Sequence, residues 1–266
     1  MATRKKITRK KAARAAPASR ALVLTEPSES ALAQYSELFD PELTAGAAGG
    51  GGGLAPFIGT EDGIMRRGEN VIGTELNAVV LGVSIDHALY PGRYQKGQPN
   101  NPICFYVGSD LEHAKPHASA PAPQHATCEG CLKDAFGSGQ GNAKACRQSR
   151  RLLLLPWGDN VDPEADQLYR LRVPPTSIKH VSAYYEKLKS FKRPMQTVVT
   201  HIEIRGHETN RFEVVLTPIE RIDGEVIVTL ARRAQEGREA LFSVPIADQG
   251  KKKGAAPGRR KVVRRR

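Results

Sequence analysis

The chain has 266 residues, with 40 Lys or Arg against 28 Asp or Glu and a formal net charge of +12. No apolar run approaches the ~20 residues that a membrane-spanning helix needs, and LLLL at 152–155 is the longest obvious apolar block. The composition therefore gives no reason to expect a membrane protein, and the positive balance indicates an anionic partner.

The positive charge is concentrated at the two ends. Residues 1–20 hold eight Lys or Arg and residues 251–266 hold nine, with no acid in either segment. The ends thus carry +17, and residues 21–250, with 23 basic and 28 acidic side chains, have a net charge of −5. Such ends predict disordered arms that contact phosphate without reading sequence, with a solubilising or localisation role as the alternative.

The N-terminal part combines an arm with a linker. ALAQYSELF (31–39) predicts a short helix, and the glycine-rich segment AGAAGGGGGLAP that follows predicts a flexible linker. We therefore assign residues 1–56 to a basic arm, short helix and linker, residues 57–248 to one folded domain, and residues 249–266 to a basic disordered tail.

Strand patterns dominate the folded domain. One helix is predicted at 176–191, where Thr176 or Ser177 can cap the first turn after two prolines. β-branched or otherwise apolar segments predict strands in this order: 71–85, 102–107, 151–157 and 167–175 before that helix, and 196–206, 212–219 and 225–233 after it.

This order predicts a mainly β domain with one central helix. Strands, a helix and then further strands are typical of an OB-fold, a small Greek-key barrel that binds single strands on one face. The expectation is therefore an OB-fold-like Greek-key barrel, and a Greek-key sandwich fits the number of strands almost as well. In the barrel, the segment between the second and third strands is an insertion at the rim of the binding groove.

That insertion contains every cysteine of the chain. Two of them form a C-x-x-C step and the others flank it, a spacing that can close a tetrahedral thiolate site around zinc. Four protein ligands leave no position for a water nucleophile, so the pattern predicts a structural Zn²⁺ site. The predicted ligands are Cys104, Cys128, Cys131 and Cys146.

Two alternatives to four sulfur ligands stay open. Disulfides are less favoured because the N-terminus has no apolar segment resembling a secretory signal, which predicts a reducing, cytoplasmic location. In the second alternative, one of three histidines in the same insertion replaces Cys104 as a ligand: His113, His117 or His125.

Motifs of catalysis do not accompany the cysteines. The sequence has no G-x-x-x-x-G-K-[ST] phosphate loop, no G-x-S-x-G elbow and no H-E-x-x-H helix. A zinc deaminase would need Pro before the C-x-x-C, where this chain has Ala-Thr. We therefore expect a protein that is not an enzyme. A nuclease or nucleotidyl-transfer enzyme using Asp86, Asp110 and Asp159 is the weaker alternative.

Nucleic-acid contacts are expected where cations and rings occur together, because bases stack on exposed rings. One group lies beside the last cysteine and a second surrounds the turn YPGRYQKGQ. Burial is the more common fate of a Trp, so the single tryptophan is included on its position at a strand end. The candidate residues are Tyr90, Arg93, Tyr94, Lys96, Lys144, Arg147, Arg150, Arg151 and Trp157.

Several motifs between residue 66 and about residue 204 occur in a fixed order. They are RRGENVIG, YPGRY, NPIC, TCEGC, FGSGQGNAKACR running into RRLLLLP, and VPPTSIKHVSAYYEKL followed by VVTHIEI. This arrangement resembles phage-encoded single-stranded DNA-binding proteins of replication and recombination modules. The resemblance implies an OB-type core, zinc on Cys104, Cys128, Cys131 and Cys146, and a role in coating single-stranded DNA in the host cytoplasm.

The C-terminus departs from that group. Such proteins commonly end in an acidic tail that recruits partners, whereas this chain ends in RRKVVRRR. A basic end seeks phosphate, which favours condensation or annealing over recruitment.

Two functions follow as hypotheses. The first is a non-enzymatic protein that binds single-stranded DNA, or RNA, in a cationic groove beside a structural zinc. The second is a basic-tailed structural or packaging protein. Its domain would assemble with itself or with another protein, and only its arms would touch nucleic acid.

Overall fold

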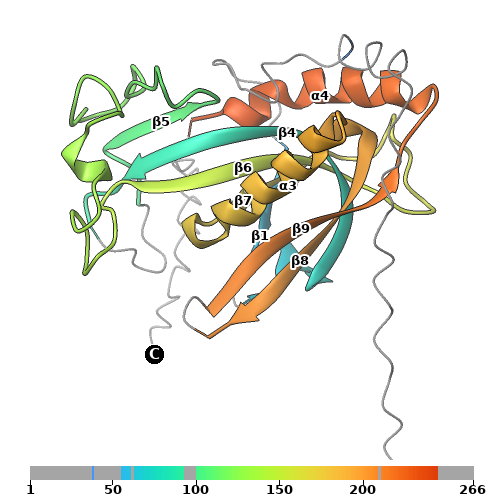
Figure 1. The fold of residues 1–266 in the computed structure, drawn as a ribbon, viewed down its shortest axis with the longest axis horizontal. Helices are drawn as coiled ribbons and strands as arrows, with labels where there is room; N and C mark the ends of the chain where they lie inside the picture. The colour runs from blue at the N-terminus through green and yellow to red at the C-terminus, as the bar shows by residue number, and fades with distance from the viewer. Residues whose placement is uncertain (1–37, 39–54, 61–62, 93–99, 209–210, 245–266) are drawn as a thin grey trace, which may run out of the picture.

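The structure is a computed structural model that describes residue 38 and residues 55–60, 63–92, 100–208 and 211–244. These residues form a mainly β fold with one curled, mixed sheet in the shape of a half-barrel and two α-helices (Figure 1). The expected arms and linker, and the helix at 31–39 except for Leu38, lie outside the described residues.

The sheet has nine strands, and two helices pack on it. The strands are β1 (Phe57–Gly59), β2 (Met65–Arg67), β3 (Asn70–Gly73), β4 (Glu75–Leu89), β5 (Cys104–Gly108), β6 (Arg147–Pro156), β7 (Tyr169–Val173), β8 (Val198–His207) and β9 (Arg211–Arg221). The helices are α3 (Ile178–Ser190) and α4 (Val226–Phe242), and short 3₁₀ turns are η2 (Leu132–Asp134), η3 (Pro175–Ser177) and η4 (Met195–Thr197).

Strand order around the sheet is β3-β2-β1-β7-β6-β4-β8-β9, with β5 paired to β4 off this path. Only β1 and β7 pair in parallel among the described strands. The long strand β4 pairs with β6 along most of its length, with β8 near its start and with β5 near its end. Figure 1 shows β5 and the loops after it at one end of β4, away from β9.

The run of four leucines in β6 is explained by two covered faces. Leu152 and Leu154 belong to a core with Val181, Tyr184 and Leu188 of α3. Leu153 and Leu155 belong to a second core whose helical residues come from α4. A strand buried on both faces needs a continuous apolar run rather than an alternating one. The sheet is therefore the middle layer, with α3 on one face and α4 on the other.

Most predicted strands and the helix at 176–191 have counterparts, but the prediction of a strand at 225–233 is wrong. These residues open α4, so the domain has two helices where one was expected. The β-branched start of EVIVTLARR favours a strand. The segment is nevertheless helical, because helical spacing lets its apolar residues bury one face against the sheet. These residues are Ile227, Leu230, Ala234 and Leu241.

Gly237 fits α4 closely to the sheet. A Cβ at this position would meet the side chains of Leu153 and Leu168 at less than van der Waals distance. A glycine inside a helix is normally unfavourable, so close approach to the sheet explains it here. No helix in the described part of the chain has the length and apolar character needed to cross a membrane.

Candidate metal centre

The insertion between β4 and β6 begins and ends beside one strand. Cys104 opens β5 and pairs with Leu89 of β4, and Cys146 immediately precedes Arg147, which pairs with Ala88 on the other edge of β4. Two cysteines distant in sequence therefore reach the same end of β4 from its two sides. The pairing of β5 and β6 with the two edges of β4 is sufficient to explain this convergence.

The C-x-x-C step forms a compact turn. The Cys131 amide donates to the Cys128 carbonyl at 3.3 Å, and Gly130 between them has φ +72°, a backbone conformation that favours glycine. The Cys146 amide donates to the Lys133 carbonyl at 2.8 Å. Cys128, Cys131 and Cys146 thus belong to one hydrogen-bonded unit.

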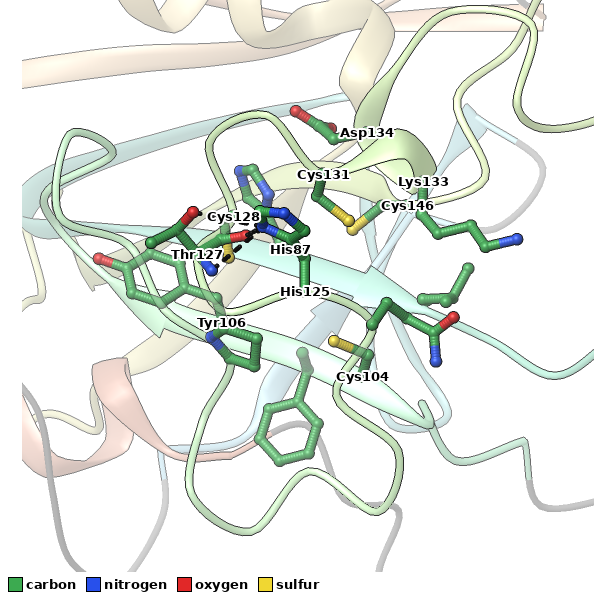
Figure 2. A pocket seen from close by; sticks show the side chains of 14 residues that line it. His87, Cys104, Tyr106, His125, Thr127, Cys128, Cys131, Lys133, Asp134 and Cys146 are labelled. Atoms are coloured by element: carbon green, nitrogen blue, oxygen red, sulfur yellow. Dashed lines mark hydrogen bonds between the residues drawn. The ribbon is translucent and has the colours of Figure 1, made fainter.

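All four cysteines line one pocket, together with His87, His125 and Asp134 (Figure 2). Each cysteine is a free thiol. Burial and the neighbouring thiols raise the pKa of Cys128 to about 11. Burial, followed by Asp134 and the other thiols, raises the pKa of Cys146 to about 12. These thiols therefore stay protonated at neutral pH unless a cation compensates the charge of their thiolates.

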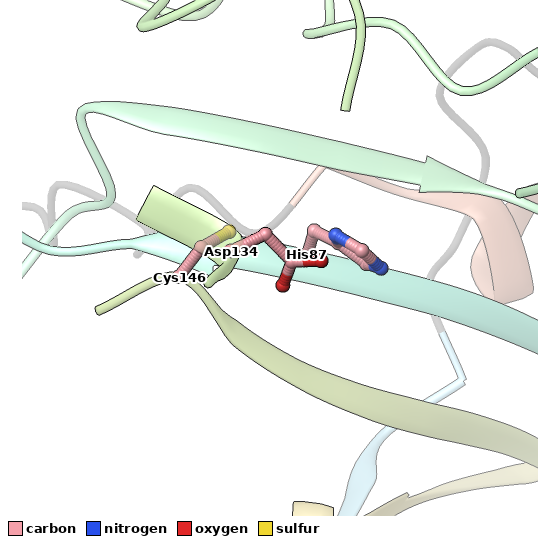
Figure 3. Close-up of side chains that lie close together, drawn as sticks. All are labelled: His87, Asp134 and Cys146. Atoms are coloured by element: carbon pink, nitrogen blue, oxygen red, sulfur yellow. The ribbon is translucent and has the colours of Figure 1, made fainter. Parts of the chain in front are cut away.

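His87, Asp134 and Cys146 bring three candidate ligand atoms within 4.8 Å of one another (Figure 3). His87 is in β4, Asp134 ends η2, and Cys146 directly precedes β6. The His87 side chain is buried, and neither ring nitrogen has a hydrogen-bond partner among the described residues. Asp134 has partners, because Gln148 Nε2 donates to its two oxygens at 2.9 and 3.0 Å and Lys144 Nζ lies 3.3 Å from Oδ2.

The three histidines considered as alternative ligands differ in position. His125 lines the pocket, with Nδ1 3.0 Å from the Thr127 carbonyl oxygen. His113 is exposed and contacts Asp110 at 2.7 Å. His117 stacks on Phe105 with ring centroids 5.3 Å apart. Asp110, Glu112 and His113 also cluster, but all three are exposed.

Sequence analysis missed His87 as a candidate ligand. The available signal was the Asp-His pair inside the apolar stretch LGVSIDHALY, since polar residues inside a buried strand need partners. The candidate ligands near His87 are Asp134, which ends η2, and Cys146, the residue before β6. Only the pairing of β6 with β4 reveals them.

Arg151, predicted to contact nucleic acid, is buried with 1% of its surface exposed. Its Nη2 donates to Asp86 Oδ2 at 2.5 Å, and its Nη1 donates to the carbonyls of Leu241 and Ser243 at 2.8 and 2.7 Å. The guanidinium therefore holds the C-terminal end of α4 against the sheet. We leave Arg151 out of any surface contact.

Arg150, the neighbour of Arg151, lies on the opposite face of β6. It is half-buried and lines a pocket of about 190 Å³ between α3 and the sheet, which Tyr185 also lines. Burial lowers the pKa of Arg150. In the described structure its Nη1 donates to its neighbour's carbonyl at 3.2 Å, which leaves most of its five N–H donors for a ligand.

The other predicted contact residues have mixed positions. Arg147 is exposed, whereas Lys144 is engaged by Asp134 and lies 5.1 Å from the Phe136 ring centroid. Trp157 packs against the α4-side core, and Tyr90 is half-buried. Three further predicted residues lie outside the described part of the chain: Arg93, Tyr94 and Lys96.

Comparison with known proteins returned no family model, no curated protein and no solved structure that matches this chain.

Proposed function

We propose that the chain is a non-enzymatic protein that binds single-stranded nucleic acid through an OB-like core, with an adjoining loop fixed by a structural zinc. The observation that carries this proposal is the order of five strands in the sheet. Numbered along the chain as β4, β6, β7, β8 and β9, they lie in the order third, second, first, fourth, fifth.

This order supports the proposal because it matches the order expected of an OB-fold opened between its third and fifth strands. The first strand pairs with both the second and the fourth, as β4 does with β6 and β8. The helix between the third and fourth strands corresponds to α3, which lies between β7 and β8. In the described residues β7 and β9 are not paired, which is why the sheet is a half-barrel.

The cysteine pocket lies where a loop of an OB-fold would contact the ligand. It lies in the connection between the first and second of the five strands, β4 and β6. In OB-folds that connection and the one between the fourth and fifth strands flank the ligand. Thiolate donors suit zinc, and an ion bound by the pocket's donors would hold the loop rigid beside the ligand.

In the described residues, Arg150 provides a cationic site on the α3 face. Arg150 combines a half-buried guanidinium with apolar walls and with Tyr185, which is 43% exposed. A nucleotide could bind here with its phosphate hydrogen-bonded to the Arg150 guanidinium and its base stacked on the Tyr185 ring. Glu186 also lines the pocket, so the site should favour a single phosphate over a dense array of phosphates.

Both arms add affinity that does not depend on the groove. They carry +17, and the chain between them carries −5. Binding should therefore fall steeply with salt, because each neutralised phosphate releases a counterion.

A second candidate function is favoured by one observation. Arg151 is buried beneath α4 and Trp157 packs against the α4-side core, so neither of these predicted contacts is on an open surface. A basic-tailed packaging protein, with nucleic acid bound by the arms alone, accounts for this equally well.

Measurement of affinity for matched single-stranded and duplex oligonucleotides at two salt concentrations separates the two. The full-length chain is compared with a full-length variant in which the arm Lys and Arg residues are replaced by Gln. The OB-like proposal predicts weaker binding that keeps its preference for single strands. Loss of all binding in the variant supports the packaging function, and equal affinity for duplex in the native chain contradicts the OB-like proposal.

A further inference from the structure

We propose that His87 is an inner ligand of the metal, together with Cys128, Cys131 and Cys146, and that Cys104 remains a free thiol beside the ion. This inference rests on the metal binding in the proposed function, and it changes the ligand set from four sulfurs to three sulfurs and one nitrogen. The pocket is lined by more donors than the four that the ion takes: the four thiols, the His87 and His125 imidazoles and the Asp134 carboxylate. His125 Nδ1 contacts the Thr127 carbonyl and Asp134 is engaged by Gln148, so the choice lies among the four thiols and His87.

His87 is buried without hydrogen-bond partners among the described residues. Only 3% of its surface is exposed, and both Nδ1 and Nε2 lack hydrogen-bond partners. Leaving a buried polar group without a partner is unfavourable, and buried polar groups are nearly always satisfied. Metal binding to one ring nitrogen would remove part of that cost. No protein group in the described structure does so.

His87 and Cys146 are close enough to share one ion. A ring nitrogen of His87 and the Cys146 sulfur lie within 4.8 Å of each other. Two ligands of one tetrahedral zinc lie roughly 3.5 Å apart, given zinc–ligand distances of about 2.0–2.3 Å, so a small adjustment accommodates the ion. Cys146 is joined through the Lys133 carbonyl to the turn that holds Cys128 and Cys131. Cys128 and Cys131 line the same pocket as His87 and Cys146.

Charge also bears on the choice of ligands. Asp134 stands beside His87 and Cys146 but is already engaged by Gln148 and Lys144, so it acts as a fixed negative neighbour. Zinc with four thiolates carries −2, and zinc with three thiolates and a neutral imidazole carries −1. Repulsion from Asp134 in a part-buried site favours the set with the smaller negative charge.

Cys104 is the donor most easily left out. It belongs to β5 and not to the hydrogen-bonded unit that carries the other three sulfurs. A thiol is a weak donor that tolerates a half-buried position without a partner, whereas an imidazole does not. The surplus donor should therefore be Cys104.

Metal retention in full-length variants tests the ligand set. Zinc-loaded protein is challenged with a graded chelator, and His87→Ala should lose zinc at a chelator concentration at least tenfold lower than the native chain. Cys104→Ser should retain zinc as the native chain does. His113→Ala is the matched control, because His113 is exposed and paired with Asp110.

Native alkylation followed by mass mapping gives a second readout. In the zinc-loaded native chain, iodoacetamide should modify Cys104 and leave the other three thiols protected. X-ray absorption of the native zinc protein, which needs no variant to fold, should report three sulfur ligands and one nitrogen.

The outcomes separate this inference from the proposed function. Four sulfur ligands, with Cys104 protected and His87→Ala retaining zinc, overturn the inference and leave the metal site of the proposed function standing. Absence of zinc from the native chain, with no uptake on addition, overturns both.

Discussion

The two faces of the β4–β6 pair use similar side chains for different purposes. We call the α4 face, which carries Asp86 and Arg151, the closed face, and the α3 face, which carries Arg150 and His87, the open face. On the α4 face, Asp86 and Arg151 form a buried ion pair that is completed by carbonyls at the end of α4. On the α3 face, Arg150 and His87 are held in or beside pockets with few protein partners. Arg151 Nε is also buried without a partner in the described residues, but the two terminal nitrogens of Arg151 are bonded within the protein and build structure. A polar side chain with few protein partners at a pocket is instead a candidate to bind a ligand.

The closed face gathers positive charge where a helix ends. Arg170 Nη1 donates to the Ala240 carbonyl at 3.0 Å, and its guanidinium lies 4.0 Å from the Phe57 ring centroid. Burial and neighbouring Arg151 lower the pKa of Arg170 to about 10. The free carbonyls at a helix C-terminus attract cations, so these arginines serve to attach α4.

Asp86→Ala tests the closed face and should have the largest effect. It leaves Arg151 buried without its carboxylate, which should lower the free energy of unfolding by about 3–5 kcal/mol. Urea unfolding measures this change. Asp110→Ala, at an exposed aspartate, should stay within about 0.5 kcal/mol of the native chain. A loss below 1 kcal/mol for Asp86→Ala would show that the pair is not a structural element.

Zinc affinity should rise with pH on the open face. Because the pKa values of Cys128 and Cys146 lie at about 11 and 12 without metal, binding at neutral pH must release protons. For each proton released, affinity should increase about tenfold per pH unit below those values. Competition with a zinc indicator between pH 6 and 8 measures the slope. A flat profile contradicts thiolate ligation.

Gly237→Ala tests how closely α4 approaches the sheet. The added methyl group has no room beside Leu153 and Leu168, so stability should fall by about 1–3 kcal/mol in spite of the better helix propensity of alanine. Val228→Ala, at an exposed position of the same helix, should change stability by less than about 0.5 kcal/mol. A stabilising effect of Gly237→Ala would contradict the close approach of α4 to the sheet at this position.

Arg150→Ala tests the nucleic-acid role of the open face, with the smallest expected effect. Affinity for a single-stranded oligonucleotide should fall about fivefold, and the slope against salt should decrease by about one. Thermal unfolding should change little, because Arg150 donates only to a neighbouring carbonyl in the described structure. Unchanged affinity together with an unchanged salt slope would restrict nucleic-acid binding to the arms.

The sequence predicted the features that depend on local pattern. The spacing of Cys128 and Cys131 indicated a turn with two donors. The strand before the insertion followed from its β-branched residues, and the strand after it from its run of leucines. The sequence also predicted that Cys104 and Cys146 lie near that turn, and all four cysteines line one pocket in the structure. The ligand set itself stays a prediction.

Other features depended on tertiary structure. Arg150 and Arg151 are adjacent in sequence, and only the position of α4 decides that one is open and the other buried. The β-branched start of α4 concealed that helix. His87 could not be recognised as a ligand candidate from pattern alone, because its neighbours Asp134 and Cys146 reach it only after β6 pairs with β4.

Elemental analysis of full-length protein, purified under reducing conditions without added metal or chelator, tests the metal centre most directly. The account predicts about one zinc per chain, with all four cysteines free of disulfides once the metal is removed. A chain that contains no zinc and binds none when it is supplied, or one whose cysteines are paired as disulfides, would contradict it.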